Sequence, residues 1–177
     1  MSSGAADQAQ LGTLRAMAHP VRLRILSLLT GAAMSAAEVA RELDLTHANA
    51  SYHLRLLHDV GLLVGAGEEA IRGGRAKRYR YDLDNPGSSS PDPATSALYY
   101  QAIAGELVRR ATSRESVGAK GTSSDAELWV PREVWDDVVE RVSAAMLDLH
   151  RGAVAPRTAG TLRVSATTAL FEMGHTA

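Results

Sequence analysis

Two short amphipathic segments joined by a three-residue turn place the strongest constraint on the fold of this chain. The first, SAAEVARELDL, opens with Ser35 and Glu38 at the spacing of a capping box. The second, THANASYHLRLLHDVGLL, opens at Thr46, a suitable N-cap, and reaches Gly61, where a left-handed C-terminal cap is favoured. This arrangement predicts two consecutive helices that meet at a tight turn.

The second of these helices is expected to have two different faces. Ala50, Leu54 and Leu57 recur at i, i+4 and i+7, which places them toward a core. The outward positions are 47, 48, 51, 52 and 55, and they are rich in hydrogen-bonding groups while lacking lysine and glutamate. Taken alone, such a face is more often a solvated helix surface than one that binds a polar ligand, and the neighbouring segments are needed to decide between the two.

The segments on either side extend the pattern. A helix is predicted after AHP, with Pro20 at its first position and a stop at Gly31, and a shorter amphipathic helix precedes it. After Gly61 the periodicity changes to two, with a GG turn at residues 73–74. We therefore expect a two-stranded hairpin with a cationic tip.

The C-terminal half begins after a stretch dense in turn formers, DNPGSSSPDPATS. Beyond it we expect a helix over about 94–112, a short strand at AELWV, a helix from Pro131 and a final strand at TLRVSATTALFEM. The predicted fold is α+β and mainly helical. Its parts are an N-terminal winged helix-turn-helix domain at 8–83, a linker at 84–96, and a C-terminal helical and short-strand region for dimerisation or sensing at 97–177.

Composition limits the class of protein. The 177 residues are 45% apolar and include no cysteine, so the chain has enough apolar residues for a core but no disulfide or thiolate metal site. No apolar run approaches a membrane span and the first ten residues lack the features of a signal peptide, so we expect a cytoplasmic protein with no membrane partner. Residues 15–81 carry a net charge of +4 and residues 82–177 a net charge of −4, which favours a polyanionic partner for the first half only.

The order helix, helix, turn, helix, basic hairpin is that of a winged helix-turn-helix, in which the helix after the turn enters a DNA major groove and the hairpin contacts adjacent backbone. Three stretches also resemble the ArsR-like winged-helix transcriptional regulators: LRAMAHPVRLRILSLL, SAAEVARELDLTHANASYHLRLLHDVGLL and AIRGGRAKRYRY. The resemblance spans about residues 11–83, and more loosely the C-terminal half is similar to the appended region of actinobacterial members. It implies a homodimeric regulator of double-stranded DNA, often a repressor.

By this resemblance, the helix residues that contact DNA are Thr46, His47, Asn49, Ser51, Tyr52, His53 and Arg55. Arg55 would anchor a phosphate or recognise guanine, and Asn49 would pair with adenine or else support the turn. His53 lies at the edge of the buried stripe, so a packed histidine is an equal alternative. In the hairpin, Arg72, Arg75, Lys77 and Arg78 are expected to contact phosphates, unless they form only a solvated charge run.

A homodimer needs an apolar surface away from the DNA. The candidates are Leu11, Leu14 and Met17 in the first helix and Leu98, Tyr99, Ile103, Leu107 and Val108 in the helix after the linker. The alternative is that both stripes pack within one subunit. Farther along, Trp129, Trp135, Leu149, Leu162, Val164, Leu170 and Phe171 would cover a small sheet or line a pocket for a small-molecule effector.

Other classes of function find little support. Asp148 and His150 are two residues apart and share no helix face, so a metal site is not expected, and no nucleotide-binding or catalytic motif is present. We therefore predict a non-enzymatic regulator without cofactors. The alternatives are a small-molecule or metal sensor, or a winged helix that binds proteins rather than DNA.

Overall fold

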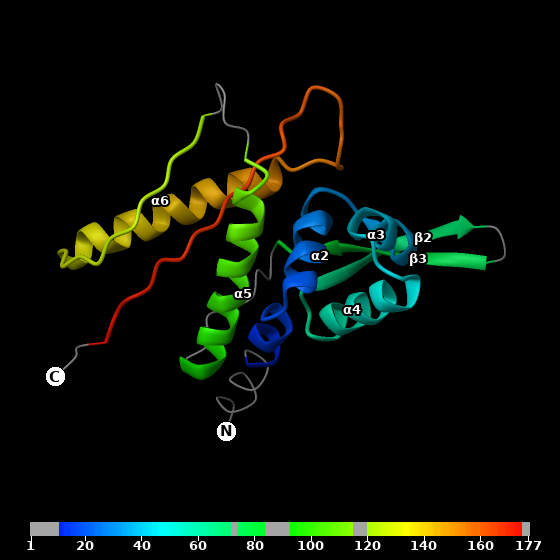
Figure 1. The fold of residues 1–177 in the computed structure, drawn as a ribbon, viewed down its shortest axis with the longest axis horizontal. Helices are drawn as coiled ribbons and strands as arrows, with labels where there is room; N and C mark the ends of the chain where they lie inside the picture. The colour runs from blue at the N-terminus through cyan, green and yellow to red at the C-terminus, as the bar shows by residue number, and fades with distance from the viewer. Residues whose placement is uncertain (1–10, 72–73, 84–92, 115–119, 175–177) are drawn as a thin grey trace.

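The computed structural model describes residues 11–71, 74–83, 93–114 and 120–174 (Figure 1). Residues 11–17 are helical, and the N-terminal half continues as α2 (Pro20–Gly31), β1 (Met34–Ser35), α3 (Ala36–Leu43), α4 (His47–Asp59), β2 (Leu63–Ile71) and β3 (Gly74–Tyr81). Two long helices follow, α5 (Pro93–Ala111) and α6 (Arg132–Arg151). The fold is α+β and mainly helical, as predicted.

The ends of α3 and α4 form as the sequence predicts. The Ser35 side chain accepts a hydrogen bond from the Glu38 backbone N–H at 3.4 Å, and the Glu38 carboxylate accepts from the Ser35 N–H at 2.7 Å, which completes the capping box. The Thr46 hydroxyl accepts from the Asn49 N–H at 3.2 Å. Gly61 adopts a φ of 79°, and the next N–H, that of Leu62, donates to the Leu57 carbonyl at 3.0 Å, which is a Schellman ending.

The hairpin belongs to a three-stranded antiparallel sheet of order β1-β3-β2. The pairs Met34↔Tyr79 and Leu63↔Tyr81 set its register, and an irregularity between Gly65 and Glu68 includes Gly67 at a φ of 89°. The two-residue strand β1 was not predicted, because a pair of residues is too short to show a period of two. It joins the hairpin directly to the start of α3, which completes a winged helix-turn-helix.

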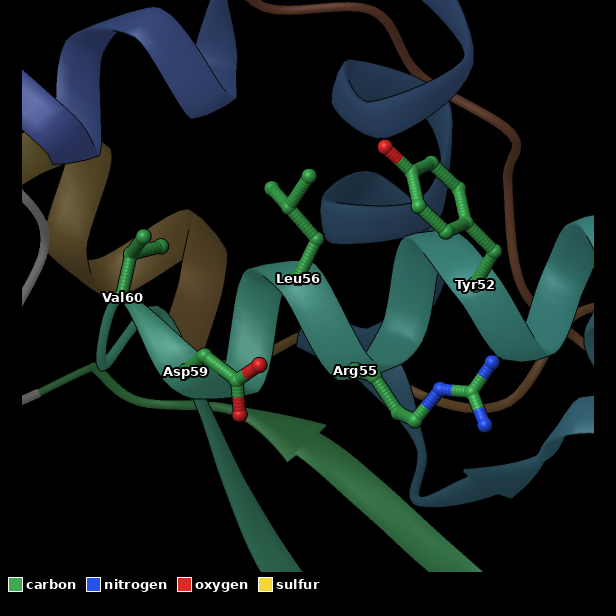
Figure 2. Close-up of a pocket in the computed structure, with 5 residues that line it drawn as sticks. All are labelled: Tyr52, Arg55, Leu56, Asp59 and Val60. Atoms are coloured by element: carbon green, nitrogen blue, oxygen red, sulfur yellow. The ribbon is translucent and has the colours of Figure 1, made fainter.

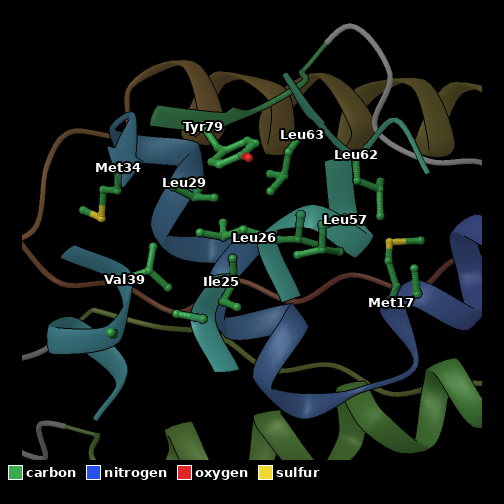
Figure 3. Packing of buried hydrophobic residues seen from close by; sticks show 14 of the residues in the cluster. Met17, Ile25, Leu26, Leu29, Met34, Val39, Leu57, Leu62, Leu63 and Tyr79 are labelled. Atoms are coloured by element: carbon green, nitrogen blue, oxygen red, sulfur yellow. The ribbon is translucent and has the colours of Figure 1, made fainter. Parts of the chain in front are cut away.

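The core lies between α2, α3, α4 and the sheet (Figure 3). Its largest fully buried side chains are Ile25, Leu29, Val39, Leu54, Leu57, Leu62 and Leu63. Leu14 and Met17 also belong to it, with exposed fractions of 2% and 7%. Their stripe therefore packs within the subunit, which was the alternative to its role in a dimer interface.

Helix α5 is attached to the winged helix through a buried carboxylate. Glu106 is 4% exposed, and its carboxylate lies 2.7 Å from an Arg109 guanidinium nitrogen and 3.8 Å from one of Arg24 in α2. Arg110 approaches the same carboxylate at 3.8 Å. The helix begins at Pro93, inside the stretch predicted as a linker, whose residues 84–92 lie outside the described part of the chain. Thus α5, which the sequence assigned to the C-terminal region, packs on the N-terminal domain.

The two strands predicted in the C-terminal half are wrong. Residues 126–130 and 161–173 belong to no strand, and α6 between them contains no buried residue. Trp129 and Leu162 are 91% and 87% exposed, so they neither cover a sheet nor line a pocket. In the described ranges, no helix is both long and apolar enough to cross a membrane.

Candidate nucleic-acid interface

The outer face of α4 carries mostly polar side chains. It lies near the hairpin formed by β2 and β3, which we call the wing. His47, Ala48, Asn49, Tyr52 and Arg55 are exposed, and Ser51 is half-buried. Ala50, Leu54 and Leu57 are buried, as their spacing predicted. The structure therefore brings most of the predicted helix residues together on one accessible face.

The N-terminus of α4 is open to an anion. Its first turn contains no acidic residue, and residues 47–49, which form that turn, are exposed. Backbone N–H groups at a helix start carry partial positive charge and have no partner within the helix, so they attract phosphate. Thr46 satisfies one of these groups, that of Asn49, and the N-terminus thus retains donors for a ligand.

A shallow hollow of about 320 Å³ follows α4 toward its C-terminus. Figure 2 shows Tyr52, Leu56 and Val60 along one side of the helix and Arg55 and Asp59 along the other. The Arg55 guanidinium projects freely from the helix, as a group that reaches into a groove must do.

His53 does not share this exposure. Its side chain is 6% exposed and packs between rings, 5.2 Å from His19 and 5.3 Å from Tyr52 between ring centroids. Its Nδ1 has no hydrogen-bond partner within the described residues. Burial lowers the pKa of His53, and the nearby His19 and Arg22 lower it further. The packed alternative therefore describes His53 in the free chain, and direct base contact would require it to move.

The wing arginines differ from one another in their partners. Arg75 is 73% exposed and pairs with Glu68 at 2.7 Å, on the surface of the hairpin. The ammonium of Lys77 lies 5.2 Å from the centre of the Tyr79 ring, and the rest of its side chain is exposed. Arg72 lies outside the described residues. Both Arg75 and Lys77 can exchange these weak surface contacts for phosphate oxygens at small cost.

Arg78 instead holds the wing to the helices. Only 25% of its side chain is exposed, and its guanidinium pairs with Glu38 at 3.1 Å and with Glu69, and donates to the Ala33 carbonyl. Partial burial of Glu38 acts to raise its pKa, but hydrogen bonds from Ser35 and the charge and hydrogen bond of Arg78 outweigh this and lower it. The structure therefore gives Arg78 a packing role that the sequence did not suggest.

Two arginines near this surface were missed. Arg22 lies close enough to Tyr52 for the two groups to interact electrostatically, and it donates to the Arg15 carbonyl at 3.0 Å. Arg80 is exposed on β3, opposite Val64. The alternation of the hairpin identified the face of Arg80, but nothing in the spacing of Arg22 indicated its proximity to α4, because that contact depends on how α2 crosses α4.

Metal-ligating chemistry is not evident at this surface. Within the described ranges, no group of three or more histidine, aspartate or glutamate side chains is arranged to hold an ion.

Comparisons with known proteins agree with this geometry. Residues 17–65 match a family profile described as a helix-turn-helix domain. The chain is also 35% identical, over 74 residues, to an uncharacterised helix-turn-helix-type transcriptional regulator of Methanocaldococcus jannaschii, in an alignment that covers 40% of this chain and 78% of that protein. The matched profile contains α2, α3 and α4 in full, which are the elements that form the exposed face described above. The chain therefore belongs to the family of helix-turn-helix-type transcriptional regulators.

Proposed function

We propose that this protein is a cytoplasmic, sequence-specific regulator of transcription of the ArsR-like type, which binds double-stranded DNA as a homodimer and represses the genes it controls. The observation that supports this best is the exposed N-terminal face of α4, whose first turn lacks acidic residues while Tyr52 and Arg55 project beside it. A duplex presents phosphates and base edges, and this face presents the donors and positive charge that suit both.

In the proposed complex, the N-terminal half of α4 lies in the major groove. Thr46, His47, Asn49, Ser51, Tyr52 and Arg55 face the bases and the flanking phosphates, with Arg55 as the main guanine reader or phosphate anchor. Arg75 and Lys77 at the wing bind the DNA backbone through charge, together with Arg72, which lies outside the described residues. Arg78 acts by holding the wing in position, and His53 acts by packing beneath Tyr52.

Repression follows from occupancy of the operator. A dimer that covers two adjacent half-sites excludes other proteins from the same stretch of duplex, so binding within a promoter blocks transcription. A reporter gene placed behind the selected operator tests this part of the proposal, since its output should fall when the regulator is expressed and should rise if the protein is an activator.

Binding itself is tested by selecting duplex fragments from random DNA and measuring their affinity by fluorescence anisotropy. Arg55→Ala should weaken binding to the selected fragment by about 10- to 100-fold, the range for loss of one bidentate base contact. Arg114→Ala is the matched control, since Arg114 is an exposed arginine outside α4, outside the wing and outside the C-terminal half of the chain from residue 120 onward. It should leave the affinity within a factor of two.

The wing makes a separate contribution. Replacing Arg75 and Lys77 together by alanine should weaken binding to all sequences alike and reduce the slope of log affinity against log salt by about 2. A winged helix that binds proteins instead would enrich no sequence in the selection. In that case neither set of variants would change anisotropy, and the proposal would be wrong.

A further inference from the structure

The C-terminal part of the chain leaves most of its apolar side chains in solvent. We define the C-terminal frame as α6 together with residues 126–130 and 161–173. Its exposed large hydrophobic residues are Leu128, Trp129, Val130, Val134, Leu149, Leu162, Val164, Leu170, Phe171 and Met173. Such a concentration of exposed apolar surface marks an interaction site in a folded protein.

Residues 161–173 have the pattern of a strand and lack a strand partner. Leu162, Val164 and Leu170 alternate with Arg163 and Ser165, which is a period of two. In the described chain, no backbone hydrogen bond joins residues 162–174 to another backbone group. An extended segment with unpaired N–H and C=O groups is a template for pairing with a further chain.

This segment is nevertheless held in place at both ends. At its base, the Arg157 guanidinium pairs with Glu42 at 2.8 Å. At its far end, Glu172 pairs with Arg132 at 2.9 Å and the Phe171 ring lies 5.5 Å from that of Tyr100. These contacts attach the segment to α3, α5 and α6 and leave the apolar side chains between them exposed.

We propose that the C-terminal frame is the surface through which two copies of this chain associate, with residues 161–173 pairing as a strand in the shared interface. The proposal rests on the homodimer of the proposed function and names where its copies meet. The frame lies within residues 97–177, which the sequence suggested for dimerisation or sensing. It differs from the residues named there for the interface, which were Leu11, Leu14 and Met17 and the apolar stripe of α5.

Three observations favour a second copy as the occupant. Ten large apolar side chains of the frame are between 41% and 91% exposed, which is ample apolar surface for the roughly 800 Å² per partner of a stable interface. Residues 120–174 carry six basic and eight acidic side chains, so two copies meet without strong repulsion, whereas a nucleic acid would be disfavoured. The frame also lies at the end of the molecule opposite the β2–β3 hairpin (Figure 1), so association there leaves both wings free.

Symmetry supports the same choice. A twofold interface places the same surface of both copies in contact, so one set of exposed apolar residues becomes covered in both chains at once. A substitution within it therefore acts twice in each dimer.

The test compares substitution of the apolar side chains Leu162 and Val164 with substitution of an exposed serine. Sedimentation velocity of the full chain over a concentration series should give a dimer whose dissociation constant rises by about 100-fold or more in the Leu162→Asp/Val164→Asp variant. Ser123→Asp, at an exposed serine outside the frame, is the control, and it should change the dissociation constant by less than about 3-fold. Leu162 and Val164 are 87% and 69% exposed in the single chain, so the variant should keep the wild-type circular dichroism.

Thiol accessibility provides a second readout, because the chain contains no cysteine. In Val164→Cys, the introduced thiol should react with a maleimide at protein concentrations below the dissociation constant and be protected above it. In Ser123→Cys, outside the frame, the thiol should react at both concentrations. Protection that does not depend on protein concentration would indicate that the segment is covered within its own chain, which would overturn the proposal.

The outcomes separate this inference from the proposed function. A wild-type chain that stays monomeric over the whole concentration series overturns the proposed interface. So does a dimer that survives Leu162→Asp/Val164→Asp but dissociates with Leu107→Asp in α5. If the protein still binds the selected DNA in either of these cases, the proposed function stands while the inference fails. If the frame forms the dimer but no duplex is enriched, the inference stands and the function fails.

Discussion

At the scale of single residues, the side chains beneath α4 are as informative as those on its surface. His53 and His19 lie ring to ring, and burial is the main cause that lowers the pKa of each. Arg22 adds to both effects, since a nearby cation disfavours a second positive charge. The face that we assign to DNA therefore rests on a neutral histidine pair.

This pair predicts an acid-sensitive fold. A histidine whose pKa is lower in the folded than in the unfolded chain binds fewer protons when folded, so its contribution to stability is complete above the unfolded value, near 6.5, and is lost as the pH falls toward the folded value. The melting temperature should therefore drop between pH 7.5 and pH 5. In His53→Gln the drop over this range should be smaller. An equal drop in both proteins would show that His53 is not the group that titrates.

Arg78 gives a second prediction at this scale. Its pairs with Glu38 and Glu69 and its bond to the Ala33 carbonyl link β3 to the start of α3. Arg78→Ala should lower the free energy of unfolding by about 2 kcal/mol, typical of lost hydrogen bonds to charged groups that are partly buried. Urea denaturation measures this. Arg75→Ala, which removes a surface pair, should cost less than about 0.5 kcal/mol.

The two variants should also differ in how they change DNA binding. Arg75→Ala should reduce the salt dependence, whereas Arg78→Ala should lower stability with little change in that slope. The reverse result would assign the phosphate contact to Arg78 and remove its packing role.

At the scale of elements, the close approach of the C-terminal half to α2 produces a test with opposite signs at two glycines. A Cβ atom at Gly31 would lie 2.3 Å from the Val154 carbonyl oxygen, whereas one at Gly105 in α5 would meet nothing within 4 Å. Alanine is the better helix former at both positions. Gly105→Ala should therefore stabilise the protein by about 0.5–1 kcal/mol, while Gly31→Ala should destabilise it by about 1–3 kcal/mol.

Thermal or urea unfolding of the two variants gives these values directly. Stabilisation by Gly31→Ala would mean that residues 152–158 do not pack on the end of α2 in solution. The placement of the C-terminal frame would then need revision.

The attachment of α5 to α2 is a further property of elements. Glu106 is buried beside three partly exposed arginines that belong to two helices, so its removal leaves their positive charges without the shared carboxylate. Glu106→Ala should cost about 3 kcal/mol, the lower end of the range for breaking a buried ion pair, because Arg109 reaches solvent. Glu140→Ala on the exposed surface of α6 serves as the control and should cost less than about 0.5 kcal/mol. Similar losses in both would argue against the buried cluster.

At the scale of the whole molecule, the proposed homodimer constrains the DNA it selects. Two α4 helices related by a twofold axis enter successive major grooves on one side of the duplex when the half-sites lie about 34 Å, or roughly 10 base pairs, apart. Selected fragments should contain an inverted repeat with this spacing. Inserting 5 base pairs between the halves rotates one of them to the far side of the duplex and should reduce affinity at least 10-fold, as measured by anisotropy. Equal affinity for both spacings would show that the copies bind independently.

Local signals in the sequence were sufficient to predict the helix-turn-helix and its exposed face. These signals act between residues a few positions apart, and all of them form as expected. They are the capping residues Ser35, Glu38 and Thr46, the stop at Gly61, and the apolar spacing of Ala50, Leu54 and Leu57. Helix ends and helix faces depend on neighbours in the chain, so they can be recognised without a fold.

Contacts between distant residues were decided only by the tertiary structure. How the elements cross decides three of these contacts. It determines whether Arg78 faces solvent or Glu38, whether His53 is packed, and whether Leu14 and Met17 lie inside one subunit. The period of two at residues 161–173 predicted a strand, yet a strand needs a partner for its backbone groups, and none is available among the described residues of the same chain. The sequence pattern of a segment indicates which secondary structure it is suited to form. The arrangement of the other elements determines whether a partner for its backbone groups lies beside it.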